Sequence, residues 1–216
     1  MKIDFQRVAA PEGAREVILV RHGACDPPAA DGLIGGRSDP SLNERGRGQA
    51  AAVTRRLAGA RVGAVFVTPL RRTTETAAAT LSRHGLEATV LEELVEVYLG
   101  EWEGHGIHAR GAAGDPELVR VMREQDWSLI PGAEPAHEFA ARVRRGVEAV
   151  ADAAPPDGVA VAFTHAAVIA EFCRQVTGSQ PFAFLRNANG SLTRLFRAPE
   201  GSWSLVSFNE TQHLDG

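Results

Sequence analysis

Residues 16–23 read EVILVRHG, an apolar run that ends in an arginine, a histidine and a glycine. A short apolar run of this kind is typical of a strand that is buried on both faces of a parallel sheet. Residues 62–67 and 159–163 have the same character, and a segment with helical patterning follows each of the three runs. Strands that alternate with helices predict an α/β fold with a mainly parallel sheet.

The rest of the chain fits this alternation. Helices are expected at 42–57, 71–83, 117–124, 134–153 and 166–177, a short strand at 88–91, and a final hairpin between 192 and 208. Ser41 or Asn43 is the expected cap of the first helix, and Gly85 and Gly178 are expected to end two others. Residues 24–40 and 100–116 are expected to be irregular because they are rich in glycine, proline or both. We predict a flexible arm at 1–14 and a single catalytic domain at 15–216.

Composition narrows the classes of function. The chain has 216 residues, of which 44% are hydrophobic and 23% charged, as in ordinary globular proteins. Its formal net charge of −4 argues against a general nucleic-acid binder. Apolar runs are too short for a membrane helix, and no secretory signal is evident. Two cysteines are too few for a disulfide scaffold. From these features together we expect a cytoplasmic protein without nucleic-acid or membrane partners.

Polar side chains gather where the predicted strands end. Arg21, His22 and Gly23 follow the first strand, Arg71 and Arg72 lie just beyond the second, and His165 follows the strand at 159–163. Ligands of such sheets bind beyond the carboxyl ends of the strands, so these residues are expected to share one site. A neutral imidazole is a nucleophile, and arginine forks bind phosphoryl oxygens. Glycine allows the backbone to approach a phosphate closely.

The ordered motifs around these residues resemble those of the histidine phosphatase superfamily, whose fold is phosphoglycerate mutase-like. The resemblance extends from about residue 17 to the last strand and rests on six segments: RHG at 21–23, SDPSLNERGRGQA at 38–50, TPLRRTTETA at 68–77, LVE with GEWEG at 94–96 and 100–104, PGAE at 131–134, and TH at 164–165. It implies a three-layer α/β/α sandwich and phosphoryl transfer to histidine. The family chemistry needs no cofactor and no metal, because arginines supply the positive charge.

The resemblance also implies a role for each site residue. His22 is implied as the nucleophile, and Glu96 as the acid that protonates the leaving oxygen and then activates water. Arg21, Arg72 and His165 are implied to bind the phosphoryl oxygens, with Gly23 and Asn189 beside them. The motif register favours Arg72 over its neighbour Arg71.

Three functions follow from this resemblance. We favour a metal-independent phosphomonoester hydrolase that acts on a phosphorylated small molecule through a phosphohistidine. The alternatives are a cofactor-dependent phosphoglycerate mutase and a catalytically impaired phosphate-binding module. The second alternative rests on Cys25 and Pro28, which stand where the family has a threonine and an asparagine. The family likeness also allows a homodimer.

Other polar residues near these motifs have simpler interpretations. His105, His108 and His137 match no metal-binding spacing. Cys25 is expected to be a small apolar filler. The remaining acids of this region are expected to be mostly a solvated face: Glu92, Glu93, Glu101 and Glu103.

Overall fold

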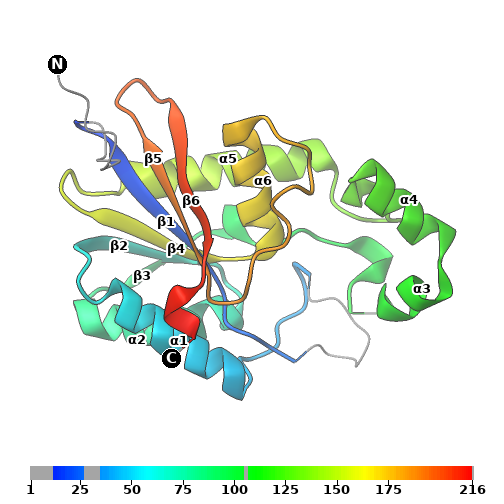
Figure 1. Cartoon of the computed structure of the whole chain (residues 1–216), viewed down its shortest axis with the longest axis horizontal. Helices are drawn as coiled ribbons and strands as arrows, with labels where there is room; N and C mark the ends of the chain where they lie inside the picture. The colour runs from blue at the N-terminus through cyan, green and yellow to red at the C-terminus, as the bar shows by residue number, and fades with distance from the viewer. Residues whose placement is uncertain (1–11, 27–34, 105–106, 216) are drawn as a thin grey trace.

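The computed structural model describes residues 12–26, 35–104 and 107–215, and a six-stranded sheet forms its centre (Figure 1). The strand order is β3-β2-β4-β1-β5-β6. β5 runs antiparallel to β1 and β6, and the other pairings are parallel, so the predicted mainly parallel sheet is confirmed. The strands are β1 Arg15–Arg21, β2 Val62–Val67, β3 Ala88–Val90, β4 Val159–Thr164, β5 Leu192–Arg197 and β6 Trp203–Glu210.

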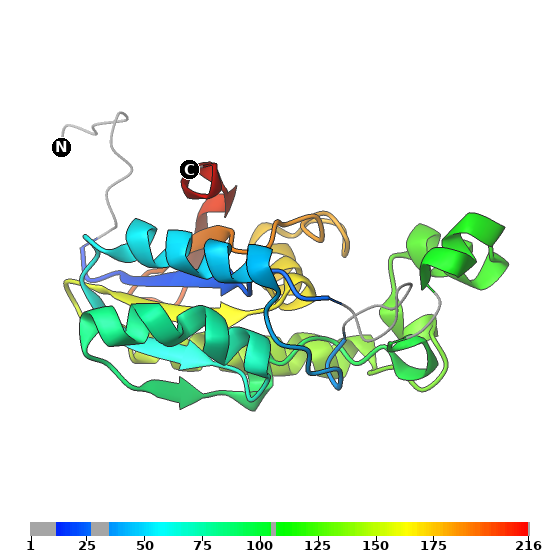
Figure 2. The same ribbon diagram turned by 90° about the horizontal axis from the view of Figure 1, so that it is seen from below.

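Helices cover both faces of the sheet, which confirms the predicted three layers (Figures 1 and 2). α1 (Glu44–Leu57) and α2 (Arg71–His84) pack on one face, and α5 (Ala136–Asp152) and α6 (Ala166–Thr177) pack on the other. α3 (Ile107–Ala113) and α4 (Pro116–Glu124) project beyond the carboxyl ends of the central strands (Figure 2). Short 3₁₀ turns complete the chain: η1 Glu92–Leu94, η2 Gly100–Trp102, η3 Trp127–Leu129 and η4 Gln212–Leu214.

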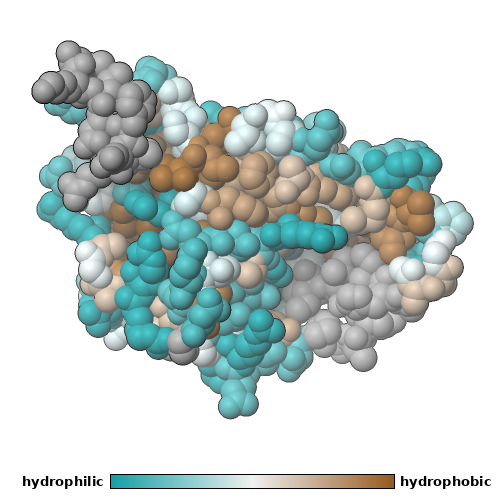
Figure 3. Space-filling view, viewed as in Figure 1, coloured by the Kyte–Doolittle hydropathy of each residue, from teal (hydrophilic) through white to brown (hydrophobic). Residues whose placement is uncertain are grey.

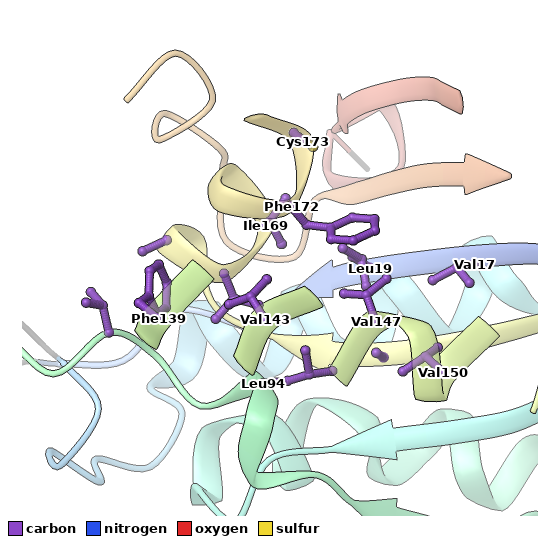
Figure 4. Close-up of a cluster of buried hydrophobic side chains, with 14 of the residues drawn as sticks. Val17, Leu19, Leu94, Phe139, Val143, Val147, Val150, Ile169, Phe172 and Cys173 are labelled. Carbon is purple, nitrogen blue, oxygen red and sulfur yellow. The ribbon is translucent and has the colours of Figure 1, made fainter. Parts of the chain in front are cut away.

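The side chains of β1 alternate between two apolar clusters. Val17 and Leu19 join the cluster beneath α5 and α6, whereas Ile18 and Val20 join the cluster beneath α1 and α2. Figure 4 shows the first cluster, with side chains of α5 and α6 packed over β1. Both faces of the strand are therefore buried, and each such side chain contributes about 1.5–3 kcal/mol of stability.

Capping residues fix most helix ends close to the predicted positions. The Asn43 side chain accepts a hydrogen bond from the backbone N–H of Gly46, so α1 begins at Glu44 rather than at the predicted residue 42. Gly85 and Gly178 end α2 and α6 with left-handed backbones, at φ of 65° and 68°, as predicted. α5 begins two residues later than predicted, because Pro135 holds the position before its first turn in an extended conformation.

The prediction for residues 100–116 is wrong in part. This segment contains η2 and α3, whose alanines and arginine favour a helix despite the nearby glycines. Gly114, at φ 64°, follows the end of α3. Residues 1–11 of the predicted N-terminal arm lie outside the described residues.

Figure 3 shows the hydropathy of one face of the molecule. The surface over α1 is mostly hydrophilic, in agreement with a helix that turns its apolar stripe toward the sheet. No described helix has the length and apolar character that crossing a membrane requires.

Candidate active site

The carboxyl ends of β1 and β4 bring two histidines together. His22 follows β1, His165 follows β4, and the backbone N–H of His22 donates to the carbonyl of Thr164 at 2.9 Å. The two imidazole ring centroids are 5.2 Å apart, with 59° between the ring planes. Topology alone predicted this meeting, and the structure places the two rings side by side.

The hydrogen bond of His22 determines which ring nitrogen is available. Its Nδ1 lies 2.7 Å from the carbonyl oxygen of Gly23. Since a carbonyl only accepts, Nδ1 carries the proton and Nε2 keeps a free lone pair. Burial lowers the pKa of His22 well below its usual value, and the nearby Arg72 and Arg21 cations lower it further. The ring is therefore neutral near pH 7, the form in which it is a nucleophile.

The glycine after this histidine is required by packing. A Cβ on Gly23 would lie 2.5 Å from the carbonyl oxygen of Gly46 in α1, and a Cβ on Gly46 would lie 2.1 Å from that of Ala24. The first turn of α1 thus lies directly against the loop that carries His22. Gly23 also donates its N–H to the hydroxyl of Thr76 at 2.9 Å.

Two glycines of α1 give opposite expectations for stability. Gly46→Ala is expected to destabilise the protein by about 1–3 kcal/mol, since the new methyl group meets backbone atoms that must shift. Gly48→Ala, whose Cβ would meet nothing within 4 Å, is expected to stabilise it by about 0.5–1 kcal/mol through helix propensity. Urea unfolding of both variants measures the two effects, and equal signs would contradict the packing argument.

The adjacent arginines at the start of α2 have different environments. Arg72 is fully buried, and its two terminal nitrogens donate to the carbonyls of Ser38 at 2.6 Å and Gly35 at 3.0 Å. Arg71 is mostly exposed and forms an ion pair with Glu75 at 3.4 Å. Arg72 is therefore buried and Arg71 lies on the surface, and the motif register's choice of Arg72 as the phosphate-binding residue stays a prediction.

The loop that receives Arg72 is itself held by a carboxylate. Glu103 accepts hydrogen bonds from the backbone N–H groups of Arg37 and Ser38, the latter at 2.6 Å. It is half-buried. Glu103 is therefore an exception among the four acids that were expected to be mostly a solvated face. Its partners Arg37 and Ser38 lie more than 60 residues earlier in the chain, and no local pattern reveals them.

Buried donor groups without partners cluster around the two histidines. Within the described residues, Arg21 Nε, Arg72 Nε and His165 Nδ1 have no hydrogen-bond partner. Buried polar atoms are usually hydrogen-bonded, so these three nitrogens are available to bind a ligand at this site. Burial lowers the pKa of Arg21 and of Arg72, and Glu96 opposes this effect in both. A phosphoryl group is an anion that such donors bind well.

Glu96 is a buried carboxyl group near these cations. Its oxygens accept hydrogen bonds from the backbone N–H of Val97 at 3.0 Å and from that of Ala167 at 3.2 and 3.3 Å. Burial raises the pKa of Glu96, although these two hydrogen bonds and the cations Arg72 and Arg21 oppose the rise. A carboxyl with a raised pKa is suited to donate a proton and later accept one.

Asn189 contacts the backbone of His22. Its side-chain amide donates to the carbonyl of His22 at 3.0 Å. This contact holds the loop after β1, and a further contact with phosphate stays a prediction.

Thr68 was not predicted from the sequence as a site residue. Its hydroxyl lies 3.1 Å from Nε2 of His165 and 3.0 Å from the hydroxyl of Thr73, and all three side chains are buried. A hydrogen bond donated by Thr68 to Nε2 leaves the proton of the neutral His165 ring on Nδ1, which has no partner in the part of the chain that the structure describes. The sequence signal that could have indicated Thr68 is its position directly after β2, at the same edge of the sheet as the two histidines.

The other candidate residues have no place in the site or lie outside the described part. Among the described residues, no cluster of three or more histidine, cysteine, aspartate or glutamate side chains is suited to hold a metal. His137 is exposed on α5, and His105 lies outside the described residues. Cys25 is half-buried, and burial raises the pKa of its thiol to about 11, which makes it unreactive. Pro28 also lies outside the described residues.

Comparison with known proteins shows which proteins share this arrangement. The family model of the histidine phosphatase superfamily (branch 1) matches residues 17–211. The chain is 31% identical over 164 residues to a glucosyl-3-phosphoglycerate phosphatase of Mycobacterium tuberculosis, with 73% of each protein covered. It is 28% identical over 204 residues to a metal-independent phosphoserine phosphatase of Arabidopsis thaliana, covering 92% of this chain and 83% of that protein.

A longer relative and two solved structures complete the comparison. A bifunctional protein of Mycobacterium tuberculosis is 35% identical over 131 residues, which is 60% of this chain but only 35% of that protein's length. The structure of a mycobacterial glucosyl-3-phosphoglycerate phosphatase matches with a TM-score of 0.75 and 28% identity, over 91% of this chain and 99% of that one. A phosphoglycerate mutase structure from Bacillus anthracis gives a TM-score of 0.80 at 19% identity, over 94% of this chain and 96% of that one, a likeness of fold alone.

Proposed function

The chain belongs to the histidine phosphatase superfamily, and from that premise we propose that it hydrolyses phosphomonoesters through a phosphohistidine on His22, without a metal. The observation that carries the proposal is the unprotonated Nε2 of His22 beside three nitrogens, Arg21 Nε, Arg72 Nε and His165 Nδ1, that have no hydrogen-bond partner within the described residues. A nucleophile and a set of anion-binding groups thus occupy one buried site. Two of the relatives above, the glucosyl-3-phosphoglycerate phosphatase and the metal-independent phosphoserine phosphatase, are named as phosphatases, which supports hydrolysis.

The proposed reaction has two steps. In the first, His22 Nε2 attacks phosphorus, the bond from phosphorus to the ester oxygen breaks, and Glu96 gives its proton to the departing oxygen. In the second, a water molecule attacks the phosphohistidine, Glu96 takes a proton from the water, and the phosphorus–nitrogen bond breaks to release inorganic phosphate. The three donor side chains stabilise the negative charge on the phosphoryl oxygens during both transfers.

The substrate class we propose is a phosphorylated small molecule. We propose that the protein is an acid-type phosphatase of the cytoplasm and that it acts as a monomer or a homodimer. The names of the phosphatase relatives support small phosphate esters as a class. Nucleic acid and membrane have no part in this proposal. The mutase alternative uses the same His22 chemistry but returns the phosphoryl group to a second oxygen of the substrate.

Hydrolysis of phenyl phosphate in the presence of a chelator tests the proposal. We expect release of inorganic phosphate that the chelator does not reduce. Isomerisation of phosphoglycerate without phosphate release would favour the mutase. Phosphate binding without any turnover would favour the binding module.

The pH dependence of kcat/KM for phenyl phosphate is expected to be bell-shaped. Protonation of His22, whose pKa lies below its usual value, removes the nucleophile and gives the acid limb. Deprotonation of Glu96, whose pKa is raised, removes the acid and gives the basic limb. Glu96→Gln is expected to lose the basic limb while it keeps the acid limb. Because the substrate titrates identically with both proteins, an unchanged basic limb in this variant would contradict the assignment.

A further inference from the structure

One arginine outside the reacting groups makes an unusual set of contacts with the segment that carries Glu96. Arg142, on α5, donates through Nη1 to the carbonyls of Glu93 at 2.8 Å and Val95 at 2.6 Å. Through Nη2 it donates to the carbonyl of Glu96 itself at 3.2 Å. Three backbone carbonyls within four residues thus converge on one guanidinium group.

The guanidinium group is oriented by a second carboxylate. Glu134 accepts from Nε of Arg142 at 2.6 Å and from Nη2 at 2.8 Å, a two-pronged contact between side chains that are 15% and 17% exposed. The backbone N–H of Glu134 also donates to the carbonyl of Tyr98 at 3.0 Å. Bidentate ion pairs fix the direction of an arginine as well as its position. Glu134 and Arg142 therefore hold the chain on both sides of Glu96.

These contacts matter because the segment has little regular structure of its own. Residues 95–99 lie between η1 and η2, outside any helix or strand. By contrast, α5 is anchored in the core, where Val143, next to Arg142, is fully buried. The arginine thus ties an irregular segment to a rigid helix (Figure 4 shows α5 packed beside Leu94).

We propose that Arg142 and Glu134 are positioning residues that hold the Glu96 carboxyl in place for proton transfer to the leaving oxygen. This inference rests on the proposed phosphatase function. Neither side chain reaches the reacting atoms in this role. Their effect passes through the backbone of residues 93–98, and general acid catalysis is sensitive to displacements of about 1 Å, which cost up to roughly 10²-fold in rate.

The dependence of the rate on the leaving group separates positioning from general damage. The probes are 4-nitrophenyl phosphate, whose leaving group departs without a proton, and benzyl phosphate, whose leaving alkoxide requires one. The measured quantity is kcat/KM, because it reports phosphoryl transfer to His22 and excludes the later water step. In Arg142→Met we expect a loss of about 10- to 100-fold for benzyl phosphate and less than about threefold for 4-nitrophenyl phosphate.

Two further variants keep the test decisive. Glu134→Gln preserves the size of the side chain and removes its charge, so we expect the same selective loss in a milder form. It carries the test if Arg142→Met does not fold, which circular dichroism would reveal. In a Glu96→Gln background, Arg142→Met is expected to cause no additional loss with benzyl phosphate, because the acid it positions is already absent.

Arg144→Met is the matched control. Arg144 lies on the same helix, forms an ion pair with Glu148 at 2.8 Å and is 41% exposed. We expect equal, small changes with both substrates. Equal losses with both substrates in Arg142→Met and Glu134→Gln, or a full additional loss in the Glu96→Gln background, would overturn the positioning role. A wild-type protein that hydrolyses neither ester would instead refute the proposed function.

Discussion

Replacement of His22 by alanine is expected to lower kcat for 4-nitrophenyl phosphate by about 10⁴-fold or more, because it removes the imidazole that we propose accepts the phosphoryl group. Nδ1 of this ring is engaged with the carbonyl of Gly23, so the loss is assigned to Nε2. The measurement is steady-state release of nitrophenolate. Acid-quenched wild-type protein is also expected to gain the mass of one phosphoryl group during turnover, and His22→Ala is not.

A histidine elsewhere in the chain provides the control for this experiment. His137 is exposed on α5, so His137→Ala is expected to retain wild-type activity and phosphorylation. Mapping of the phosphorylated peptide distinguishes the two histidines of the site. A phosphoryl group on His165 with His22 unmodified would reverse the assignment, and activity retained in His22→Ala would refute the mechanism.

The sheet was predictable because its central strands are buried on both faces. The continuous apolar runs of β1 and β4 carry that signal in the sequence, and glycines at the ends of α2 and α6 mark where those helices stop. α3 was not predictable in this way. It is short, lies beyond the sheet, and its neighbouring glycines suggest an irregular segment more strongly than its alanines suggest a helix.

Some residues of the candidate site could also be predicted from the sequence, and others could not. Strand order and strand ends place His22 and His165 together, because parallel strands bring their carboxyl ends to one edge. Glu96 follows a 3₁₀ turn instead of a strand, and only the family resemblance indicated it. Thr68 and Arg142 act through contacts that span 97 and at least 46 residues of sequence, and such partners leave no local pattern.

The structure distinguishes the adjacent arginines Arg71 and Arg72, which the sequence motif alone leaves side by side. Successive residues of a helix point about 100° apart, so the two arginines point in clearly different directions. Arg72 points inward and is buried, whereas Arg71 is mostly exposed and pairs with Glu75. Arg72→Met is therefore expected to lower kcat/KM for phenyl phosphate by about 10²–10³-fold, as the loss of a donor to a developing oxyanion does. Arg71→Met is expected to change it by less than about threefold, because exposed ion pairs contribute little.

Thermal stabilisation by inorganic phosphate measures the binding part of this effect apart from turnover. Wild-type protein and Arg71→Met are expected to gain stability as phosphate is added, since a ligand that binds only the folded state raises the free energy of unfolding. Arg72→Met is expected to gain much less, because its Nε–H, unpartnered among the described residues, is one of the donors assigned to the anion. Its unliganded stability is measured in parallel, since the carbonyls of Gly35 and Ser38 lose their donor in this variant. Equal stabilisation by phosphate in both variants would show that Arg72 serves only to hold that loop.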